Sequence, residues 1–303
     1  MVKELTWELW CEVFNDPEFF RPIIFQIYEK EGMEKPAAIL GLTPGTNGVF
    51  KVDGHVIKIF VPTQVKKWSE DDFEIETFHI DRAVKLGINT PKIIASGFVV
   101  DRYKWEYLLL EYLDAAEAGH AVKKMPEDQK RAFAFEIRSL VDKMNDCDKP
   151  MIAQERLVDR VILGQRWKAY PHKIQEALAD YLSGIDLKAC CYVHGDLTAE
   201  NVMIDKVGHV HIIDFADTTI APSYYEHAPI CFDLFGCDKT LIRYYFEGLD
   251  DKQIIEELYK GLLIHDFGGE ILKILMGKCK NRTIQDLSGL DQIKEIISEA
   301  TGL

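Results

Sequence analysis

The chain carries the sequence VHGDLTAENVMI at residues 193–204 and the sequence HIIDFAD at residues 211–217. Two apolar runs in this stretch, Val202–Ile204 and Val210–Ile213, are separated by the turn sequence DKVG at residues 205–208. This pattern predicts two short strands that are joined as a β-hairpin. We expect the hairpin to bring the polar residues at its two ends to one place.

Three oxygen-bearing side chains flank this hairpin, and their chemistry suits the transfer of a phosphoryl group. Asp196 can accept a proton from a hydroxyl nucleophile, whereas Asn201 and Asp214 offer a neutral and a charged oxygen ligand for Mg²⁺. Phosphoryl transfer depends on positioning and on charge neutralisation more than on covalent help. The pattern therefore predicts a catalytic base at Asp196 and a magnesium site at Asn201 and Asp214.

The composition is that of a folded, acidic protein. The 303 residues include 36 Lys and Arg and 50 Asp and Glu, which gives a formal net charge of −14. The length predicts one large or two medium domains, and a hydrophobic fraction of 47% excludes disordered and collagen-like chains. Because phosphate-rich partners require net basic charge, the balance argues against nucleic acid and anionic membranes as partners. It is compatible with a cationic small-molecule partner, or with solubility alone.

The sequence predicts neither a disulfide framework, nor a zinc site, nor a membrane segment. The seven cysteines include no C-x-x-C pair. Glu4, Glu8 and Glu12 lie where a signal peptide needs an uninterrupted apolar stretch, and no run of about eighteen apolar residues occurs. We therefore expect a cytoplasmic protein, and no feature indicates an obligate protein partner.

The first third of the chain is rich in predicted strands. The predicted elements are a helical extension over residues 1–30 around Pro17, strands within residues 37–62, a helix capped by Ser69 and Asp71-Asp72 that runs to about Leu86, and strands at Ile93–Val99 and Trp105–Tyr112. Asp53-Gly54 is a hairpin signal inside the first strand region. Gly87, followed by Pro91, is typical of a helix end.

The remainder of the chain is mainly helical. Apolar side chains recur with a helical period over Lys130–Met144, and residues 172–183 and 230–300 also favour helices. The change of character predicts a boundary near residues 110–115. We accordingly expect an α+β fold with an N-terminal lobe over residues 1–110 and a C-terminal lobe over residues 111–303.

The loop at residues 193–204 resembles the catalytic loop of the protein-kinase-like superfamily, and its H-G-D form is similar to that of the aminoglycoside phosphotransferase branch. The resemblance implies a two-lobed protein-kinase-like fold, with a small β-rich N-terminal lobe that carries one core helix. Asp196 matches the catalytic base of the family, and Asn201 and Asp214 match its metal ligands. The implied cofactor is Mg²⁺, and the implied co-substrate is ATP or GTP.

The same resemblance extends upstream, in family order from about residue 40. It implies nucleotide-binding roles for Lys58, Glu76, Gly45, Thr46, Asn47, Gly48, Glu111 and Leu113. Lys58 matches the lysine that contacts the α- and β-phosphates, and Glu76 matches its ion-pair partner, with Glu74 as the fallback. An ordinary strand lysine is the alternative interpretation of Lys58. The glycine-bearing stretch 45–48 resembles a phosphate-covering loop, and Leu108–Leu113 resembles the hinge that contacts an adenine.

Several departures separate this chain from protein kinases. Ala216 stands where protein kinases carry the glycine of Asp-Phe-Gly, and Gly195 stands where they carry an arginine that reads activation-loop phosphate. No A-P-E motif follows at a suitable distance, and the connection to residues 221–226 is short. These differences favour a small-molecule kinase over a protein kinase that is gated by phosphorylation.

The acceptor region of this branch lies between the catalytic loop and the C-terminal helices. Acidic residues are frequent there: Asp217, Glu226, Asp233, Asp238, Glu247, Asp250, Asp251, Asp266 and Glu270. Carboxylates suit a polycation such as an aminoglycoside, although solvated helix faces explain most of them. Asp217 and Glu226 lie nearest to the chemistry in sequence, and we take them as the candidate acceptor-binding residues.

The leading hypothesis is an ATP-dependent O-phosphotransferase that acts on an aminoglycoside or aminocyclitol. A metabolic kinase of the same fold, acting on choline, homoserine or a sugar, is the first alternative. A nucleotide-binding pseudokinase that serves as an interaction module is the second. The presence of Lys58, Asp196, Asn201 and Asp214 disfavours the pseudokinase.

Overall fold

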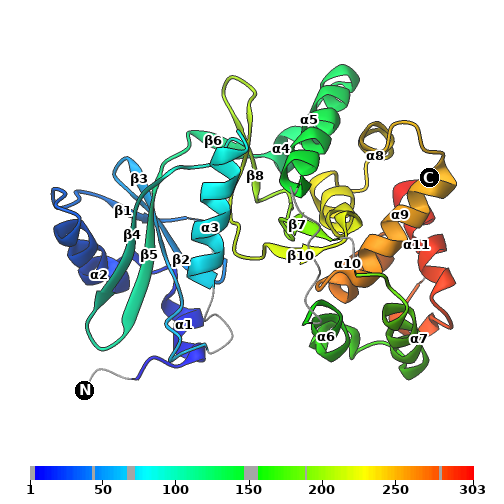
Figure 1. Cartoon of the computed structure of the whole chain (residues 1–303), viewed down its shortest axis with the longest axis horizontal. Helices are drawn as coiled ribbons and strands as arrows, with labels where there is room; N and C mark the ends of the chain where they lie inside the picture. Colours follow the sequence, from blue (N-terminus) through cyan, green and yellow to red (C-terminus); the bar gives the residue numbers. More distant parts are fainter. Residues whose placement is uncertain (1–3, 43–44, 67–71, 147–155, 188–189, 280–281) are drawn as a thin grey trace. The chain divides into compact units, whose positions relative to one another are not determined.

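The chain forms two compact units, and a short segment from the second half of the chain belongs to the first unit. A computed structural model describes residues 4–42, 45–66, 72–146, 156–187, 190–279 and 282–303 (Figure 1). The first unit comprises Met1–Asp114 with Ile213–Ala216, and the second comprises Ala115–Ile212 with Asp217–Leu303. The expected boundary near residues 110–115 includes the point where the chain leaves the first unit. Its brief return at Ile213–Ala216 was not expected from the sequence.

A five-stranded antiparallel sheet forms the centre of the first unit. Its strands are β1 (Ile39–Gly41), β2 (Gly48–Val52), β3 (His55–Ile59), β4 (Ile93–Val100) and β5 (Lys104–Glu111), in the order β1-β2-β3-β5-β4. Asp53 has a φ of 51°, as a tight turn between β2 and β3 requires. The predicted hairpin is therefore confirmed.

Three helices accompany this sheet: α1 (Trp7–Val13), α2 (Pro17–Lys30) and α3 (Asp72–Lys85). The expected helical extension is two helices, because the Asp16 side chain accepts the Glu18 N–H and Pro17 opens a new helix. The predicted caps of α3 at Ser69 and Asp71 lie outside the described residues. Gly87 follows the end of α3 with a φ of 69°, as a C-terminal glycine should.

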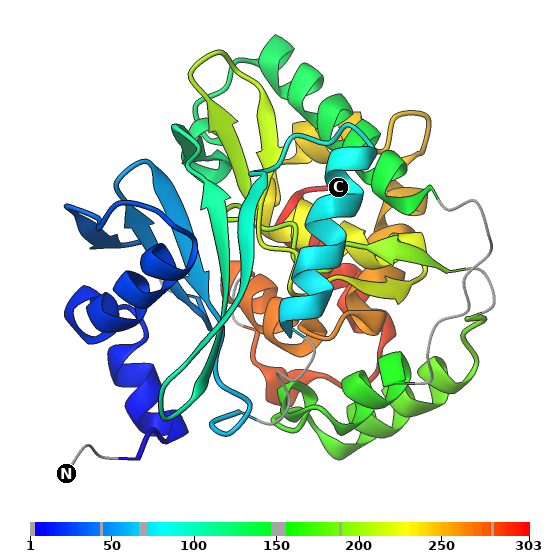
Figure 2. The same cartoon turned by 60° about the vertical axis from the view of Figure 1, so that its left-hand side comes forward.

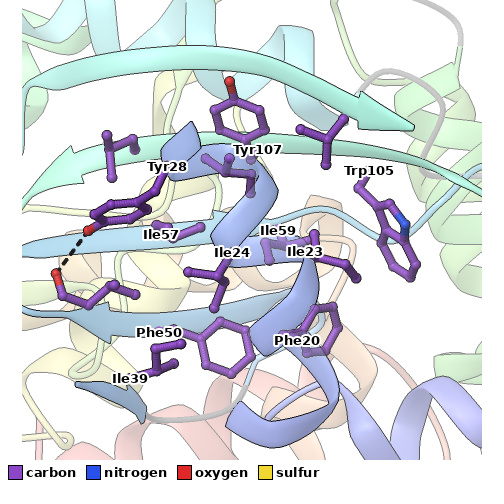
Figure 3. Close-up of a cluster of buried hydrophobic side chains, with 14 of the residues drawn as sticks. Phe20, Ile23, Ile24, Tyr28, Ile39, Phe50, Ile57, Ile59, Trp105 and Tyr107 are labelled. Atoms are coloured by element: carbon purple, nitrogen blue, oxygen red, sulfur yellow. Dashed lines mark hydrogen bonds between the residues drawn. The ribbon is translucent and has the colours of Figure 1, made fainter. Parts of the chain in front are cut away.

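The core of the first unit lies between α2 and one face of the sheet. Figure 3 shows Phe20, Ile23 and Ile24 of α2 packed against Ile57 and Ile59 of β3 and their neighbours. Side chains alternate along a strand, so Lys58 points to the opposite face. Figure 2 shows α3 on that opposite side of the sheet. The alternation within β3 thus places Ile57 and Ile59 in the core on one face of the sheet. It places Lys58 on the other face, toward α3.

The second unit contains two small sheets. β7 (Cys191–Val193) pairs with β10 (Thr219–Ala221), and β6 (Ala115–Glu117), β8 (Val202–Asp205) and β9 (Val210–Ile212) form the other, in the order β6-β8-β9. β8 and β9 are antiparallel, with Val202 opposite Ile212, which confirms the hairpin that the sequence predicts.

The rest of the second unit is helical. Its α-helices are α4 (Ala118–Val122), α5 (Glu127–Asn145), α6 (Arg156–Leu163), α7 (His172–Ser183), α8 (Lys239–Tyr245), α9 (Asp251–Ile264), α10 (Gly268–Lys278) and α11 (Asp291–Thr301). Its 3₁₀-helices are η2 (Gln165–Trp167), η3 (Ser223–Glu226) and η5 (Ile284–Asp286), and η4 (Pro229–Leu234) is a π-helix. The predicted α+β class, with a sheet-based first part and a helical second part, is confirmed. Over the described residues, no helix has the length and apolar character needed to cross a bilayer.

Candidate active site

An ion-paired cluster of three side chains lies in the first unit. Lys58 on β3 places its Nζ 2.7 Å from Oε2 of Glu76 on α3 and 2.8 Å from Oδ1 of Asp214. Lys58 and Glu76 are almost fully buried, at 5% and 1% exposure. The fallback residue Glu74 is exposed. The structure therefore selects Glu76 as the partner of Lys58, and the interpretation of Lys58 as an ordinary surface lysine does not hold.

The charges of this cluster depend on one another. Burial opposes the charge of Lys58, but the carboxylates of Asp214 and Glu76 together raise the pKa of its ammonium group above the usual value. Burial also raises the pKa of Glu76, and Lys58 acts against that rise. Removal of Lys58 would leave a buried carboxylate without a cation, which is one of the more destabilising changes in a protein.

Asp214 has an unusual backbone conformation. Its φ of 61° lies in the left-handed region, which costs about 1–3 kcal/mol for a residue other than glycine. The residue lies in the segment Ile213–Ala216, which belongs to the first unit although its chain neighbours on both sides belong to the second. The side chain is 43% exposed, and its Oδ1 pairs with Lys58.

The predicted phosphate-covering loop, residues 45–48, connects β1 to β2. Its backbone is held by α1, because Trp10 Nε1 donates a hydrogen bond of 2.9 Å to the carbonyl of Thr46. Asn47 is buried and accepts the Val61 N–H. A Cβ on Gly48 would lie 2.9 Å from the Phe14 carbonyl oxygen. The Asn47 side chain and the missing side chain of Gly48 thus have roles in packing, and their part in nucleotide binding stays a prediction.

Gly45 and Thr46 are the exposed positions of this loop. They remain available to a nucleotide phosphate. At the predicted hinge, Glu111 ends β5, and its N–H donates to the carbonyl of Lys92. Leu113 lies beyond the strand, where no sheet ladder uses its backbone.

The predicted catalytic loop lies in the second unit, between β7 and β8. Asn201 Nδ2 donates hydrogen bonds to the carbonyl oxygen of Asp196 at 2.9 Å and to its Oδ2 at 2.8 Å. This contact orients both side chains, and it turns the Asn201 carbonyl oxygen away from Asp196. The loop is further held by the Ala199 N–H, which donates to Asp233 Oδ1 at 2.7 Å.

Glu226 has a different place from the one that the sequence predicts. It is fully buried at 0% exposure, and its two oxygens accept the backbone N–H groups of His194 and Gly195. Burial raises its pKa to about 7, against the effect of the two hydrogen bonds. A carboxylate occupied in this way has no surface for an acceptor, so the predicted acceptor-binding role is wrong. Glu226 instead positions the catalytic loop.

A histidine distant in sequence holds the same loop from another side. His265 Nδ1 accepts the Phe267 N–H at 3.1 Å, so its Nε2 carries the hydrogen and donates to the Gly195 carbonyl at 3.0 Å. Burial lowers the pKa of His265 to about 4, which keeps the ring neutral. No local sequence signal marks His265, because nothing near it in the chain relates it to residue 195.

Gly195 itself is required by the packing of this loop. Its φ is 85°, and a Cβ would lie 2.4 Å from the carbonyl oxygen of Asp217. Only glycine avoids both the left-handed strain and this overlap. The same contact places Asp217 beside the catalytic loop, with an exposed side chain. Asp217 therefore remains a candidate for acceptor binding.

Most of the other acidic residues in the predicted acceptor region are used within the fold. Asp238 and Asp250 cap α8 and α9, Asp251 pairs with Arg243, Glu247 pairs with Arg131, and Asp266 pairs with Arg160 and Arg166. The sequence analysis predicts solvated helix faces for most of these carboxylates, whereas the structure gives these five partners within the fold.

The predicted metal ligands suit a hard cation. Asn201 offers an amide oxygen and Asp214 a carboxylate, and oxygen donors are what Mg²⁺ prefers. Within the described part of the chain, no group of three His, Cys, Asp or Glu side chains has the arrangement to bind a metal ion. Magnesium in nucleotide sites is held by one or two protein ligands and by phosphates, so the two residues fit that role.

The fold is shared with small-molecule kinases of known structure. An aminoglycoside 2″-phosphotransferase of type IIIa in complex with GDP and kanamycin is similar, with a TM-score of 0.61, 15% identity and coverage of 93% of this chain and 99% of that chain. A choline/ethanolamine kinase family protein from Mesorhizobium loti has a TM-score of 0.56, 14% identity and coverage of 94% and 93%. Identities this low show the fold alone. No curated protein sequence matches the chain.

The sequence itself also matches a family. The model of the phosphotransferase enzyme family (APH) matches residues 58–258, from the lysine of β3 through the catalytic loop and into α9. This range covers well over half of the chain and contains Lys58, Asp196, Asn201 and Asp214. The protein is therefore a kinase-like phosphotransferase, and the chain belongs to the phosphotransferase enzyme family.

Proposed function

We propose that this protein transfers the γ-phosphate of ATP or GTP to a hydroxyl group of a small molecule, with an aminoglycoside or aminocyclitol as the first acceptor class. The observation that carries the proposal is the buried ammonium of Lys58 between Glu76 and Asp214. A buried lysine that is held by two carboxylates is costly to maintain and has the chemistry to bind phosphate oxygens. A nucleotide-binding pseudokinase would use the same lysine for its nucleotide, so the proposal of transfer also rests on Asp196 and Asn201 in the loop.

Each residue then has a defined task. Lys58 binds the α- and β-phosphates, and Glu76 holds its side chain in place. Asp196 accepts the proton of the acceptor hydroxyl, and the hydrogen bonds from Asn201 fix the direction of its carboxylate. Asn201 and Asp214 would hold Mg²⁺, which supplies neutralisation of the phosphate charge. Gly45 and Thr46 are the loop positions that would face the nucleotide.

A similar structure contains kanamycin, which is why an aminoglycoside is the first choice. Asp217 lies beside the catalytic loop with an exposed carboxylate. One carboxylate is enough to pair with a single ammonium group of an aminoglycoside or aminocyclitol.

A second acceptor class is favoured by the charges near the loop. Asp266 pairs with Arg160 at 3.1 Å and with Arg166 at 3.3 Å, so one carboxylate faces two cations. Such a surface suits a polycation less well than a small acceptor with one positive charge. A metabolic kinase of choline or a similar hydroxyl compound is therefore the second candidate, and one similar structure is a choline/ethanolamine kinase family protein.

The test is a screen of phosphate transfer from ATP and from GTP, with Mg²⁺, to kanamycin, hygromycin B, 2-deoxystreptamine, choline, homoserine and methylthioribose. We expect transfer to at least one compound, and loss of that transfer in Asp196→Asn. The control is Glu200→Gln, which makes the same chemical change at an exposed residue of the same loop. Mg-ATP binding without turnover on any compound, or undiminished turnover in Asp196→Asn, would contradict the proposal.

A further inference from the structure

Two arginines meet on one carboxylate beside the catalytic loop, within the second unit. Arg160 of α6 and Arg166 of η2 both contact Oδ2 of Asp266, at 3.1 and 3.3 Å. Asp266 directly follows His265, whose ring donates to the carbonyl of Gly195 in the catalytic loop. The arginine pair is therefore attached to the segment that supports the loop of the proposed catalytic base.

The surrounding packing holds this arginine pair in place. The phenolic oxygen of Tyr225 accepts the Asp266 N–H at 3.1 Å. The Arg166 guanidinium lies 3.8 Å from the centre of the Phe267 ring. The backbone at Arg166 is packed as well, because a Cβ on Gly269 would lie 2.5 Å from the Arg166 carbonyl oxygen. A ligand that binds the pair therefore meets groups that the fold has already ordered, which lowers the entropic cost of binding.

The two guanidinium groups keep donors for a further anion. The side chains of Arg160 and Arg166 are 43% and 32% exposed, whereas that of Asp266 is only 11% exposed. Among the described residues, Asp266 is the carboxylate that either arginine contacts, and both use the same oxygen atom. A guanidinium has five N–H donors in a planar fork, and this fork matches a carboxylate through two parallel hydrogen bonds. The pair can therefore bind a second carboxylate that comes from solution.

Asp217 supplies a negative charge near the same place. Burial lowers the pKa of Arg160, but Asp266 and Asp217 raise it above the usual value, so Asp217 lies within electrostatic range of Arg160. Asp217 is exposed, and its carbonyl borders Gly195 of the catalytic loop. The surface beside the loop thus combines two cations with two carboxylates. This balance suits a ligand with one charge of each sign better than a polycation.

We propose that Arg160 and Arg166 bind a carboxylate of the acceptor, which is a small zwitterion such as a hydroxy amino acid. The acceptor carboxylate takes the remaining N–H donors of the two arginines, and the acceptor ammonium pairs with Asp217. The inference rests on the proposed phosphotransfer and narrows its second acceptor class to amines that also carry an acid. The transfer is unchanged: the acceptor oxygen bonds to the γ-phosphorus, the bond from that phosphorus to the nucleoside diphosphate breaks, and Asp196 takes the hydroxyl proton.

The experiment compares acceptors that differ only in the carboxylate. L-serine, L-homoserine and L-5-hydroxynorvaline are paired with their decarboxylated counterparts, ethanolamine, 3-amino-1-propanol and 4-amino-1-butanol. The three chain lengths cover different spans between the hydroxyl and the carboxylate. Transfer from Mg-ATP and from Mg-GTP to each compound, and to kanamycin, gives kcat/KM. Ligand-detected NMR on the full chain measures binding of the same compounds without turnover.

Two variants and a matched control assign the effect to the arginine pair. Arg160→Met and Arg166→Met each remove a guanidinium and keep an unbranched side chain. Arg131→Met is the control, because Arg131 also pairs with a carboxylate, that of Glu247 at 3.1 Å, and also lies over a ring, that of Phe135 at 5.3 Å. Urea unfolding of each variant shows whether it is folded under the conditions of the assay.

We expect kcat/KM for at least one hydroxy amino acid to exceed that of its decarboxylated counterpart at least 10-fold. Arg160→Met and Arg166→Met should each abolish this preference by raising KM for the acid alone, and Arg131→Met should keep it. A merely structural role of the arginines would instead lower kcat/KM for both compounds of a pair alike.

The remaining outcomes separate this inference from the proposed phosphotransfer. Equal use of acid and counterpart, or a preference for kanamycin, would overturn the inference and leave the phosphotransfer intact. Absence of transfer to every compound would count against the phosphotransfer. In that event, binding of the acids in NMR that is lost in Arg160→Met and Arg166→Met would support the carboxylate site, and absence of such binding would overturn it.

Discussion

Gly195 offers a sharp test of how the catalytic loop is positioned. The substitution Gly195→Ala adds one methyl group at a residue whose φ is 85°. The added carbon would lie 2.4 Å from the carbonyl oxygen of Asp217, about 1 Å closer than a van der Waals contact allows. Because the obstacle is backbone rather than a flexible side chain, the loop or the segment at residue 217 has to move.

The free-energy cost of Gly195→Ala has two parts, and a matched substitution can separate them. A left-handed conformation costs alanine about 1–2 kcal/mol relative to glycine. Overpacking against a rigid neighbour adds about 1–3 kcal/mol. Gly208, in the turn between β8 and β9, has a φ of 99° and nothing within 4 Å of its hypothetical Cβ. Gly208→Ala therefore carries the first cost alone.

The assay combines stability with turnover. We expect unfolding in urea to show a loss of about 2–5 kcal/mol for Gly195→Ala and of about 1–2 kcal/mol for Gly208→Ala. A displacement on the order of 1 Å at Asp196 should lower kcat about 100-fold in Gly195→Ala only. Hydrolysis of Mg-ATP by water provides this readout before an acceptor is identified. Nucleotide affinity should persist in both variants, since Lys58, Glu76 and Asp214 are untouched.

The reasoning would be refuted if the two alanine variants behaved alike in both measurements. In that event the overlap with Asp217 would have no effect, and the glycine at residue 195 would serve backbone freedom alone. A loss of nucleotide binding in Gly195→Ala would also count against it, because the damage would then extend beyond the loop.

Three further predictions concern the supports of the site. Lys58→Met should lower the free energy of unfolding in urea by about 3–5 kcal/mol and weaken ATP binding measured by calorimetry. The double variant with Glu76→Gln should recover part of the lost stability, because no buried carboxylate is then left unpaired, but it should not recover ATP binding. Burial raises the pKa of Glu226 from 4.5 to about 7, so its contribution to stability is complete below about pH 4.5 and is lost as the pH rises through about 7. Between pH 5 and pH 8, the free energy of unfolding of the wild type should therefore fall by about 2–3 kcal/mol relative to that of Glu226→Gln. If urea unfolding gave the same difference between the two proteins at both pH values, this prediction would be contradicted. Trp10→Phe removes the 2.9 Å hydrogen bond to the Thr46 carbonyl, which should raise the KM for ATP about 3- to 10-fold with kcat unchanged; a change in kcat alone would contradict a role in the phosphate-covering loop.

The elements that the sequence predicts well are those with local signals. The hairpin at residues 202–212 follows from two apolar runs around a turn, and the helix at α5 follows from its apolar period. The sequence predicts a helical extension over residues 1–30 around Pro17, whereas its division into two helices follows from the Asp16 side chain, which caps the second helix.

The chemistry of the site was determined by the sequence alone, because residue types and short spacings encode it. Asp196 and Asn201 lie five residues apart on one loop, and the alternation in β3 already separates Lys58 from its apolar neighbours. Which residues support the loop was decided only by the tertiary structure. Glu226 turns inward because its oxygens meet two backbone N–H groups in a dry environment, and His265 reaches Gly195 across seventy residues of chain. Such contacts depend on how distant segments pack, and no spacing in the sequence records that.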